Sequence, residues 1–445
     1  MALVHDHSCE CAKSELDLFT IPPTQTSIER GDWKEYRPLS SINTGGPIEF
    51  YVSGSGEEYI DLDQTQLYVR AKITRKDGSA LEDDDAVGPV NLFLHSLFSQ
   101  VDVALNGREI SSATPTYPYR AIIETLLNYS HPTKVDQLTS ALFYKDTAGK
   151  MDVADPGAPA ATGNIGLKKR SRFTNGSKEV ELIGRLHSDI FCQEKYLLSG
   201  VDLRLKLTPS KDSFVLMSSG QDPEYRVMLQ QVSLFVRKVK IAPSVLIAHA
   251  KALDKDTAKY TVRRVQTKIL SVPAGNFSLN EDHVFLGQLP KRIVIACVDS
   301  DAFNGSYTKN KFHFKHNKIN NLALHYDGVQ IPTKPLKPQF DMDDGAAHSV
   351  RSYFTLCTGT HKNYRDESVG ISREDYPAGY TLFAFDLTPD LSDGGHFNLV
   401  KEGNLRLEMN FAEALPRTIN VIVYAEFDNV IEIDKVRNIS YDYTK

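Results

Sequence analysis

Two segments of this chain, one in each half, carry the same β-hairpin pattern. Residues 99–110 and 320–331 both alternate polar and apolar side chains, and they turn at Asn106-Gly107 and Asp327-Gly328 respectively. Asn-Gly and Asp-Gly pairs supply the positive φ angles of a type I′ turn, so each is a strong hairpin signal. The sequence therefore predicts two successive all-β domains of one type.

Further strand-like segments recur in the same order in both halves. Residues 201–207 match 404–409 in pattern, and the long apolar segment 227–240 has a counterpart at 420–427. Each half offers about eight strands, which fits an eight-stranded jelly roll, a fold that closes two facing sheets and so limits exposed edges. The predicted fold class is all-β, with two tandem eight-stranded antiparallel jelly rolls (a double jelly roll) and short helical insertions.

The chain length agrees with two domains. At 445 residues it exceeds the size at which a single core normally stops growing, about 250–300 residues. We place an extended N-terminal arm at 1–45 and a first jelly roll at 46–241. A linker helix with a serine near its start follows at 242–257, then a second jelly roll at 258–434 and a C-terminal tail at 435–445.

The predicted arm is unusual for a free tail. It is rich in Pro, Thr and Ser, yet it also carries Leu16, Leu18, Phe19, Trp33 and Tyr36. Removing such apolar side chains from water is favourable. We therefore expect the arm to lie on its own body or on a neighbouring subunit.

Three other segments interrupt the strand pattern. Residues 119–128 have apolar side chains at i, i+4 spacing and predict a short amphipathic helix, whereas 91–98 fit either a short helix or a buried strand. Residues 145–178 are rich in Ala, Pro and Gly and predict a long loop. A second such stretch, 341–379, occupies a corresponding late position in the other half.

Composition narrows the functional classes. The net charge of −6 is spread along the chain and gives no indication of bulk nucleic-acid binding. Five cysteines, an odd number in a long chain, predict reduced thiols. We expect no signal peptide, because the N-terminus lacks a basic and an apolar region, and no membrane span.

Four successive segments carry a resemblance to a known family. Residues 14–28, 46–73, 102–107 and 117–127 resemble the major capsid protein of Polinton (Maverick) elements and the related adintoviruses, of the double jelly-roll capsid family. The resemblance implies a structural protein of the virion that forms homotrimers. Each trimer would be a pseudo-hexameric capsomer with six rolls, and the capsomers would tile an icosahedral shell.

The same resemblance implies partners and a location. The partners are further copies of the chain, neighbouring capsomers and a separate single jelly-roll penton protein, with a weak internal contact to DNA. The protein would be made in the host cytoplasm. We interpret 145–178 and 341–379 as outward loops at the capsomer top, and the arm and tail as contact ends.

No catalytic or cofactor motif stands out. The sequence contains no phosphate-binding loop, HExxH or GxSxG motif, so we expect no enzyme activity, no cofactor and no catalytic or metal-site residues. His5, His7, Cys9 and Cys11 are residue types that bind zinc, but their tight terminal spacing favours a disordered end.

Two basic segments allow two interpretations each. Residues 168–172 (Lys-Lys-Arg-Ser-Arg) could contact DNA or act as a localisation signal, but they fit an exposed loop better. Residues 311–316 mix Lys and His with Phe312 and Phe314, which could bind nucleic acid. An alternating strand with both Phe side chains in the core is the simpler interpretation.

Two other functions suit a tandem β architecture. A bicupin metalloenzyme needs a His-x-His pair on a barrel strand, and here this pair occurs only at His5 and His7, in the arm. A carbohydrate-binding β-sandwich usually relies on exposed aromatic side chains, and this chain has a single Trp, although Tyr could substitute. Metal analysis and a glycan-binding screen would distinguish these alternatives from a capsid protein.

Overall fold

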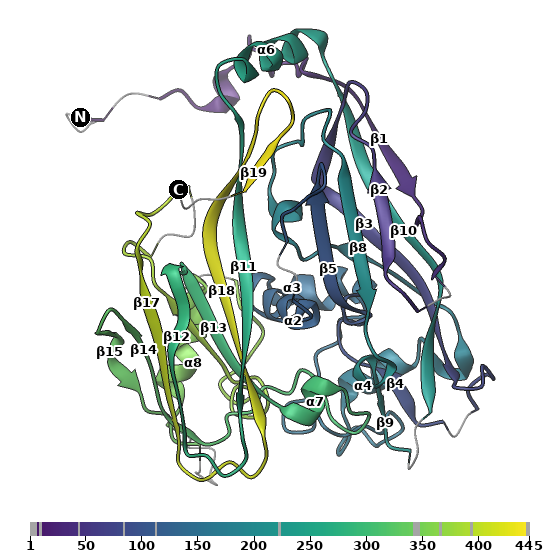
Figure 1. The fold of residues 1–445 in the computed structure, drawn as a ribbon, viewed down its shortest axis with the longest axis vertical. Coiled ribbons are helices and arrows are strands. Elements are labelled where there is room, and N and C mark those ends of the chain that lie inside the picture. Colours follow the sequence, from purple (N-terminus) through teal and green to yellow (C-terminus); the bar gives the residue numbers. More distant parts are fainter. Residues whose placement is uncertain are drawn as a thin grey trace.

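The computed structural model covers most of the chain. It describes residues 7–8, 11–42, 45–82, 85–111, 114–220, 224–340, 348–364, 367–391 and 395–441. Figure 1 shows two β-rich bodies side by side, with one helix, α6, and the start of the N-terminal arm at one end.

The first half forms two four-stranded antiparallel sheets. One has the order β1-β10-β3-β7 and the other the order β2-β8-β5-β6, and a two-stranded sheet, β4-β9, lies beside them. The strands are β1 (Ile28–Tyr36), β2 (Ile48–Val52), β3 (Glu58–Arg75), β4 (Val87–Pro89), β5 (Phe98–Leu105), β6 (Arg108–Glu109), β7 (Val180–Arg185), β8 (Leu203–Pro209), β9 (Leu216–Ser218) and β10 (Tyr225–Ile241).

The second half forms another pair of sheets. One has the order β11-β18-β13-β16, with β19 added beside β18, and the other has the order β12-β17-β14-β15. The strands are β11 (Ala258–Val272), β12 (Ser278–Gln288), β13 (Arg292–Asp299), β14 (Ile319–Tyr326), β15 (Val329–Leu336), β16 (Leu382–Asp386), β17 (Glu402–Phe411), β18 (Ile419–Ile433) and β19 (Ile439–Tyr441).

The two halves have the same topology. With the short β4 and β9 set aside, the strands β1 to β10 and β11 to β18 can each be numbered one to eight, and both halves then have sheets of order 1-8-3-6 and 2-7-4-5. The predicted pair of tandem eight-stranded jelly rolls is therefore confirmed. The matched hairpins join strands four and five of each roll, and Asn106, Gly107, Asp327 and Gly328 all have positive φ.

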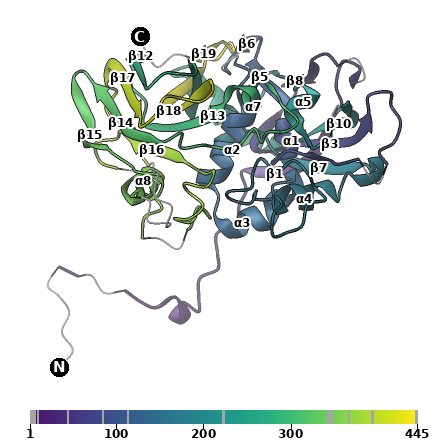
Figure 2. The same ribbon diagram turned by 90° about the horizontal axis from the view of Figure 1, so that it is seen from below.

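Helices fill the space between and around the rolls. The predicted helix at 119–128 is α2 (Tyr117–Asn128), and of the two alternatives for 91–98 the structure shows a short helix, α1 (Phe93–Ser96). Figures 1 and 2 both place α2 between the two rolls. The other helices are α3 (His131–Val135), α4 (Ile165–Ser171), α5 (Asp212–Val215), α6 (Pro243–Leu253), α7 (Ser300–Asn304) and α8 (Val350–Gly359), with 3-10 turns at Ser14–Leu16, Gln137–Ala141, Asn175–Ser177 and Asp189–Cys192.

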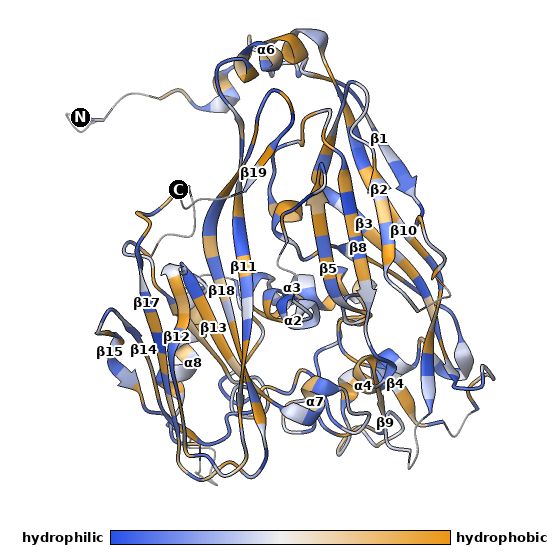
Figure 3. Cartoon of the chain, in the orientation of Figure 1, coloured by the Kyte–Doolittle hydropathy of each residue, from blue (hydrophilic) through white to orange (hydrophobic). Residues whose placement is uncertain are grey.

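The rolls share apolar contacts through the sheet that contains β13. Every residue of β13 is buried. Because side chains alternate between the faces of a strand, Ile293 and Ile295 point into the core of the second roll, and Val294 and Ala296 join the core that extends into the first half. Apolar residues accordingly run without interruption from 293 to 298 in β13, and β18 has a shorter such run at 421–423 (Figure 3). Burial on both faces explains this pattern.

The structure corrects the extent of the predicted arm. Residues 28–36 are not part of an arm, because β1 pairs along β10 and is the first strand of the first roll. The tail also differs from an extended contact end, since β19 pairs with β18. Arg437 Nε donates a hydrogen bond to the carbonyl of Ser199 at 2.7 Å, and Arg108 donates to the carbonyl of Ile439 at 2.7 Å. These contacts tie the C-terminal hairpin to the first roll.

Candidate assembly surfaces

A buried charged cluster joins the two rolls at α2. Arg120 forms ion pairs with Glu124 and with Asp189, both at 2.8 Å, and His187 Nδ1 lies 2.6 Å from Glu124 Oε2. Burial alone would raise the pKa of Glu124, but Arg120 and the hydrogen bond from His187 lower it to about 2. Asp189 also accepts a hydrogen bond from the backbone N–H of Val265 in β11 at 3.2 Å, so the cluster spans both rolls.

A second buried cluster lies in the 145–178 insertion. Arg170 and Asp146 form an ion pair at 2.8 Å with side chains that are 0% and 1% exposed. Arg170 also donates to the carbonyls of Pro89 and Tyr144, at 2.9 and 2.7 Å. Asp146 accepts from Asn310 of the second half at 3.0 Å, so this cluster too links the halves.

These contacts correct two interpretations of the insertion. Residues 168–172 are not a fully exposed basic loop: they lie largely within α4, and Arg170 is completely buried. Residues 145–178 do contribute to the core, through Met151 and Leu167, which are 1% and 0% exposed. Asn164 caps α4, since its side chain accepts hydrogen bonds from the first turn. The insertion is therefore packed, in spite of its Ala, Pro and Gly content.

The two insertions contact each other. Lys145 forms an ion pair with Asp375 at 2.6 Å, and the Tyr380 hydroxyl donates to the carbonyl of Asp146 at 2.7 Å. The backbone N–H of Gly149 donates to the carbonyl of Ala378 at 2.6 Å. Residues 341–347 and 365–366 of the second insertion lie outside the described residues. The described parts of both insertions thus form one surface, which we call the loop end.

The 311–316 segment also differs from its prediction. It is not a regular strand and has one isolated bridge, from Phe314 to Tyr380. Phe312 and Phe314 are buried as expected, but Lys311 is buried as well and donates to the carbonyls of Leu216 and Ser306 at 2.8 and 2.5 Å. Burial lowers the pKa of Lys311 to about 7. Lys311 is therefore not available to contact nucleic acid.

The opposite end of the molecule carries α6 and the arm, and we call it the arm end. No residue of α6 is buried, although seven of its side chains are Val, Leu, Ile or Ala. In the arm, Leu16, Leu18, Phe19 and Ile21 are 72%, 77%, 95% and 86% exposed. The apolar part of the arm therefore does not lie on its own body, which was one of the two expected arrangements.

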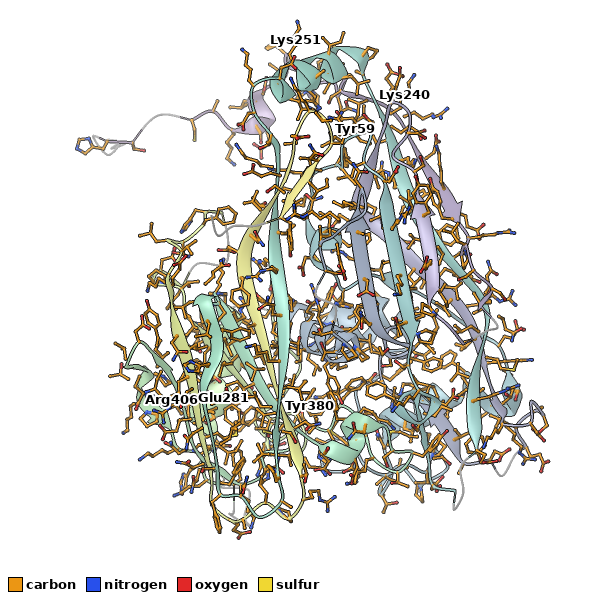
Figure 4. All side chains as sticks on the ribbon, viewed as in Figure 1. Tyr59, Lys240, Lys251, Glu281, Tyr380 and Arg406 are labelled. Carbon is orange, nitrogen blue, oxygen red and sulfur yellow. The ribbon has the colours of Figure 1, made fainter. Side chains whose placement is uncertain are left out.

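A groove lies beneath α6, between the strand ends of the two rolls. It has a volume of about 650 Å³, within the range of about 300–1,000 Å³ typical of binding pockets. Figure 4 shows Tyr59 below α6, and Lys251 on the helix. The side chains that line the groove are largely apolar or aromatic, among them Tyr59, Tyr196, Leu198, Val245, Leu253 and Tyr260.

The N-terminal metal hypothesis falls partly outside the described residues. His5 and Cys9 are not described, and His7 and Cys11 are exposed. Among the residues that the structure describes, no group of three or more His, Cys, Asp or Glu side chains is arranged to hold a metal ion. Within the same described ranges, no helix has the length and apolar character needed to cross a membrane.

Sequence reasoning missed the residues that connect the halves. Arg120 and Glu124 had a detectable signal, since they are oppositely charged at i, i+4 spacing in a helix that is otherwise apolar. Asp146 and Arg170 had none, because partners such as Asn310 and Pro89 are distant in the sequence. Lys311 donates to the nearby Ser306 but also to the distant Leu216, and the second partner left no local sign.

Comparisons with known proteins support the fold. No family model matches the chain. An uncharacterized protein of Caenorhabditis elegans is 24% identical over 429 residues, covering 94% of this chain and 98% of the relative. A chain from the cryo-EM structure of the Sputnik virophage superposes with a TM-score of 0.66 at 13% identity, covering 98% of this chain and 94% of that one.

Two capsid proteins are similar as well. The Faustovirus major capsid protein matches with a TM-score of 0.57 and 9% identity, covering 94% of this chain and 92% of its own. The mavirus major capsid protein matches with a TM-score of 0.53 and 12% identity, covering 99% and 97%. The Faustovirus and mavirus neighbours are major capsid proteins. At such identities the likeness shows a common fold.

Proposed function

We propose that this chain is a major capsid protein, a structural building block without enzymatic activity. The observation that carries the proposal is the repeated strand order, 1-8-3-6 and 2-7-4-5, in two adjacent rolls that together span the chain. The likeness to the Sputnik, Faustovirus and mavirus structures extends over at least 94% of the chain and includes both rolls. Shared coverage of this extent supports a shared architecture rather than a single common domain.

The geometry is suited to a homotrimer that acts as a pseudo-hexamer. Two rolls of equal topology stand side by side in one chain (Figure 2), so three chains around a threefold axis would present six similar units. Such capsomers would tile an icosahedral shell, with a single jelly-roll penton protein at the vertices. Many weak contacts between capsomers are sufficient in a lattice, because each additional contact forms within an already assembled structure.

The ends of the molecule would have different roles in the shell. The loop end, with its two packed insertions, would face outward, and the arm end would face neighbouring copies and the interior, where a weak contact with DNA would occur. The resemblance of residues 14–28, 46–73, 102–107 and 117–127 to Polinton (Maverick) capsid proteins supports a protein of this group that is made in a host cell and resides in the virion.

The cores of the two rolls argue against the bicupin alternative. The cores of both rolls are filled by apolar side chains such as Phe50, Leu205 and Leu407, whereas a bicupin requires metal-ligating side chains inside each barrel. Metal analysis that finds one ion per roll at full occupancy would favour the enzyme instead. Specific hits in a glycan-binding screen would favour the carbohydrate-binding alternative.

Electron microscopy of the expressed protein tests the proposal. We expect trimers with six-lobed outlines, and shells or sheets when the penton protein is added. Monomers under all conditions, with the penton protein present, would contradict the proposed function.

A further inference from the structure

The arm end leaves two apolar surfaces uncovered on the same chain. One is the arm segment 16–21, and the other is the groove beneath α6. Val245 and Leu253 of α6 are only partly buried against the core, and both line the groove. An exposed apolar surface of this kind marks an interaction site.

The arm begins at the rim of the groove but leads away from it. Ser27 and Ile28, at the root of the arm, line the groove, and Figures 1 and 2 show the chain before them extending away from the body. Pro22 and Pro23 separate this root from the apolar segment. Proline fixes φ and forces the preceding residue to be extended, so this short connection resists turning back into its own groove.

The arm is long enough to reach another molecule. Residues 13–27 span up to about 50 Å when extended, at about 3.3–3.6 Å per residue. The groove carries charges of both signs, since Glu194 and Asp256 lie beside Lys195 and Lys259 in its lining. The fit of the segment 16–21 therefore depends on its apolar side chains and not on net charge.

We propose that the segment 16–21 of one copy occupies the groove beneath α6 of a second copy. Each chain carries one arm and one groove, so the contact is head-to-tail and closes when the copies are related by a rotation. Three copies around an axis would then have every arm and every groove filled. This inference rests on the proposed function, in that the capsomer or lattice supplies the second copy.

Photo-crosslinking in the full-length chain tests the proposal. A chain with p-benzoylphenylalanine in place of Phe19 is mixed with ¹⁵N-labelled wild-type chain, assembled, irradiated and analysed by mass spectrometry. We expect cross-links between a light arm and heavy peptides from 194–198 and 241–260. The matched control carries the same photoreactive residue in place of Phe277, which is 60% exposed and follows the end of β11 that is far from the groove, and it should give no groove cross-links.

Substitutions in the labelled copy provide the second readout. Val245 lines the groove, so Val245→Asp should reduce the yield of the light–heavy product at least tenfold. Leu253 lines it as well, and Leu253→Asp should reduce the yield to the same extent if Val245→Asp fails to fold. Ile247 of the same helix is 58% exposed and does not line the groove, so Ile247→Asp should change the yield less than twofold.

Three results would overturn the inference. These are light–light cross-links alone, which place the arm in its own groove, cross-links of the arm to other surfaces, and equal effects of Val245→Asp and Ile247→Asp. Trimers whose arms cross-link elsewhere would overturn the inference and leave the proposed function standing. Monomers that yield no light–heavy product would overturn both.

Discussion

Asp146→Asn removes one buried charge with almost no change in shape, and the structure predicts a large loss of stability. Asp146 Oδ1 accepts from Arg170 and Asn164, and Oδ2 accepts from Asn310. An amide in this place would leave the Arg170 guanidinium, which is 0% exposed, without a counter-charge and would direct an N–H₂ donor at another donor. Breaking a buried pair in this way costs about 3–5 kcal/mol.

The cost translates into a measurable shift of the melting temperature. Unfolding entropy of about 2.1 cal/mol/K per residue gives about 0.9 kcal/mol/K for 445 residues, so a loss of 3–5 kcal/mol lowers Tm by about 3–5 °C. Differential scanning calorimetry of the variant and the wild type measures this shift. If only one roll unfolds in the transition, the entropy is smaller and the shift is larger.

A matched variant isolates the effect of burial. Asp63 pairs with Arg185, but their side chains are 27% and 36% exposed. Asp63→Asn should therefore cost less than about 1 kcal/mol and shift Tm by about 1 °C or less. Equal shifts for Asp146→Asn and Asp63→Asn would refute the argument that the Asp146–Arg170 pair is buried and joins the halves.

Three further changes have defined outcomes. Leu407→Ala, in the core of the second roll, should cost about 2–5 kcal/mol by calorimetry, and a loss below 1 kcal/mol would contradict the packing. Burial lowers the pKa of Lys311 to about 7, so above that pH the unfolded chain binds more protons than the folded chain. The free energy of unfolding should therefore rise by up to about 1.4 kcal/mol per pH unit from pH 7 to 9 because of this side chain. Lys311→Met should reduce this rise, and an unchanged dependence of the unfolding free energy on pH would contradict the burial of Lys311. Deleting 1–24 should leave Tm within about 1 °C but impair assembly, whereas deleting 1–40 removes β1 and should lower Tm; equal Tm values for the two deletions would contradict the role of β1.

Local patterns explain which parts of the fold were predictable. The two hairpins and α2 depend on turn residues and on apolar spacing within about a dozen residues, so their sequences indicated them directly. β1 resembles an arm in sequence because this edge strand carries polar residues, Asp32 and Lys34, on its less exposed face, and the aromatic Trp33 on its exposed face.

The contacts between the halves were not predictable for a different reason. Arg170 and Lys311 look like surface residues in their local sequences, but in the fold they are buried and donate hydrogen bonds to the distant backbone carbonyls of Pro89 and Leu216. A single sequence holds no sign of such partners. The apolar residues of the arm were visible in its composition, but the groove was not predictable, since strand ends from both rolls form it.

Cryo-electron microscopy of the assembled full-length protein tests the central claim most directly. The account predicts a threefold-symmetric capsomer in which six jelly rolls, two from each chain, are arranged as a near-hexagon. A map that shows an isolated chain, or an oligomer whose two rolls do not occupy equivalent positions around the axis, would contradict it.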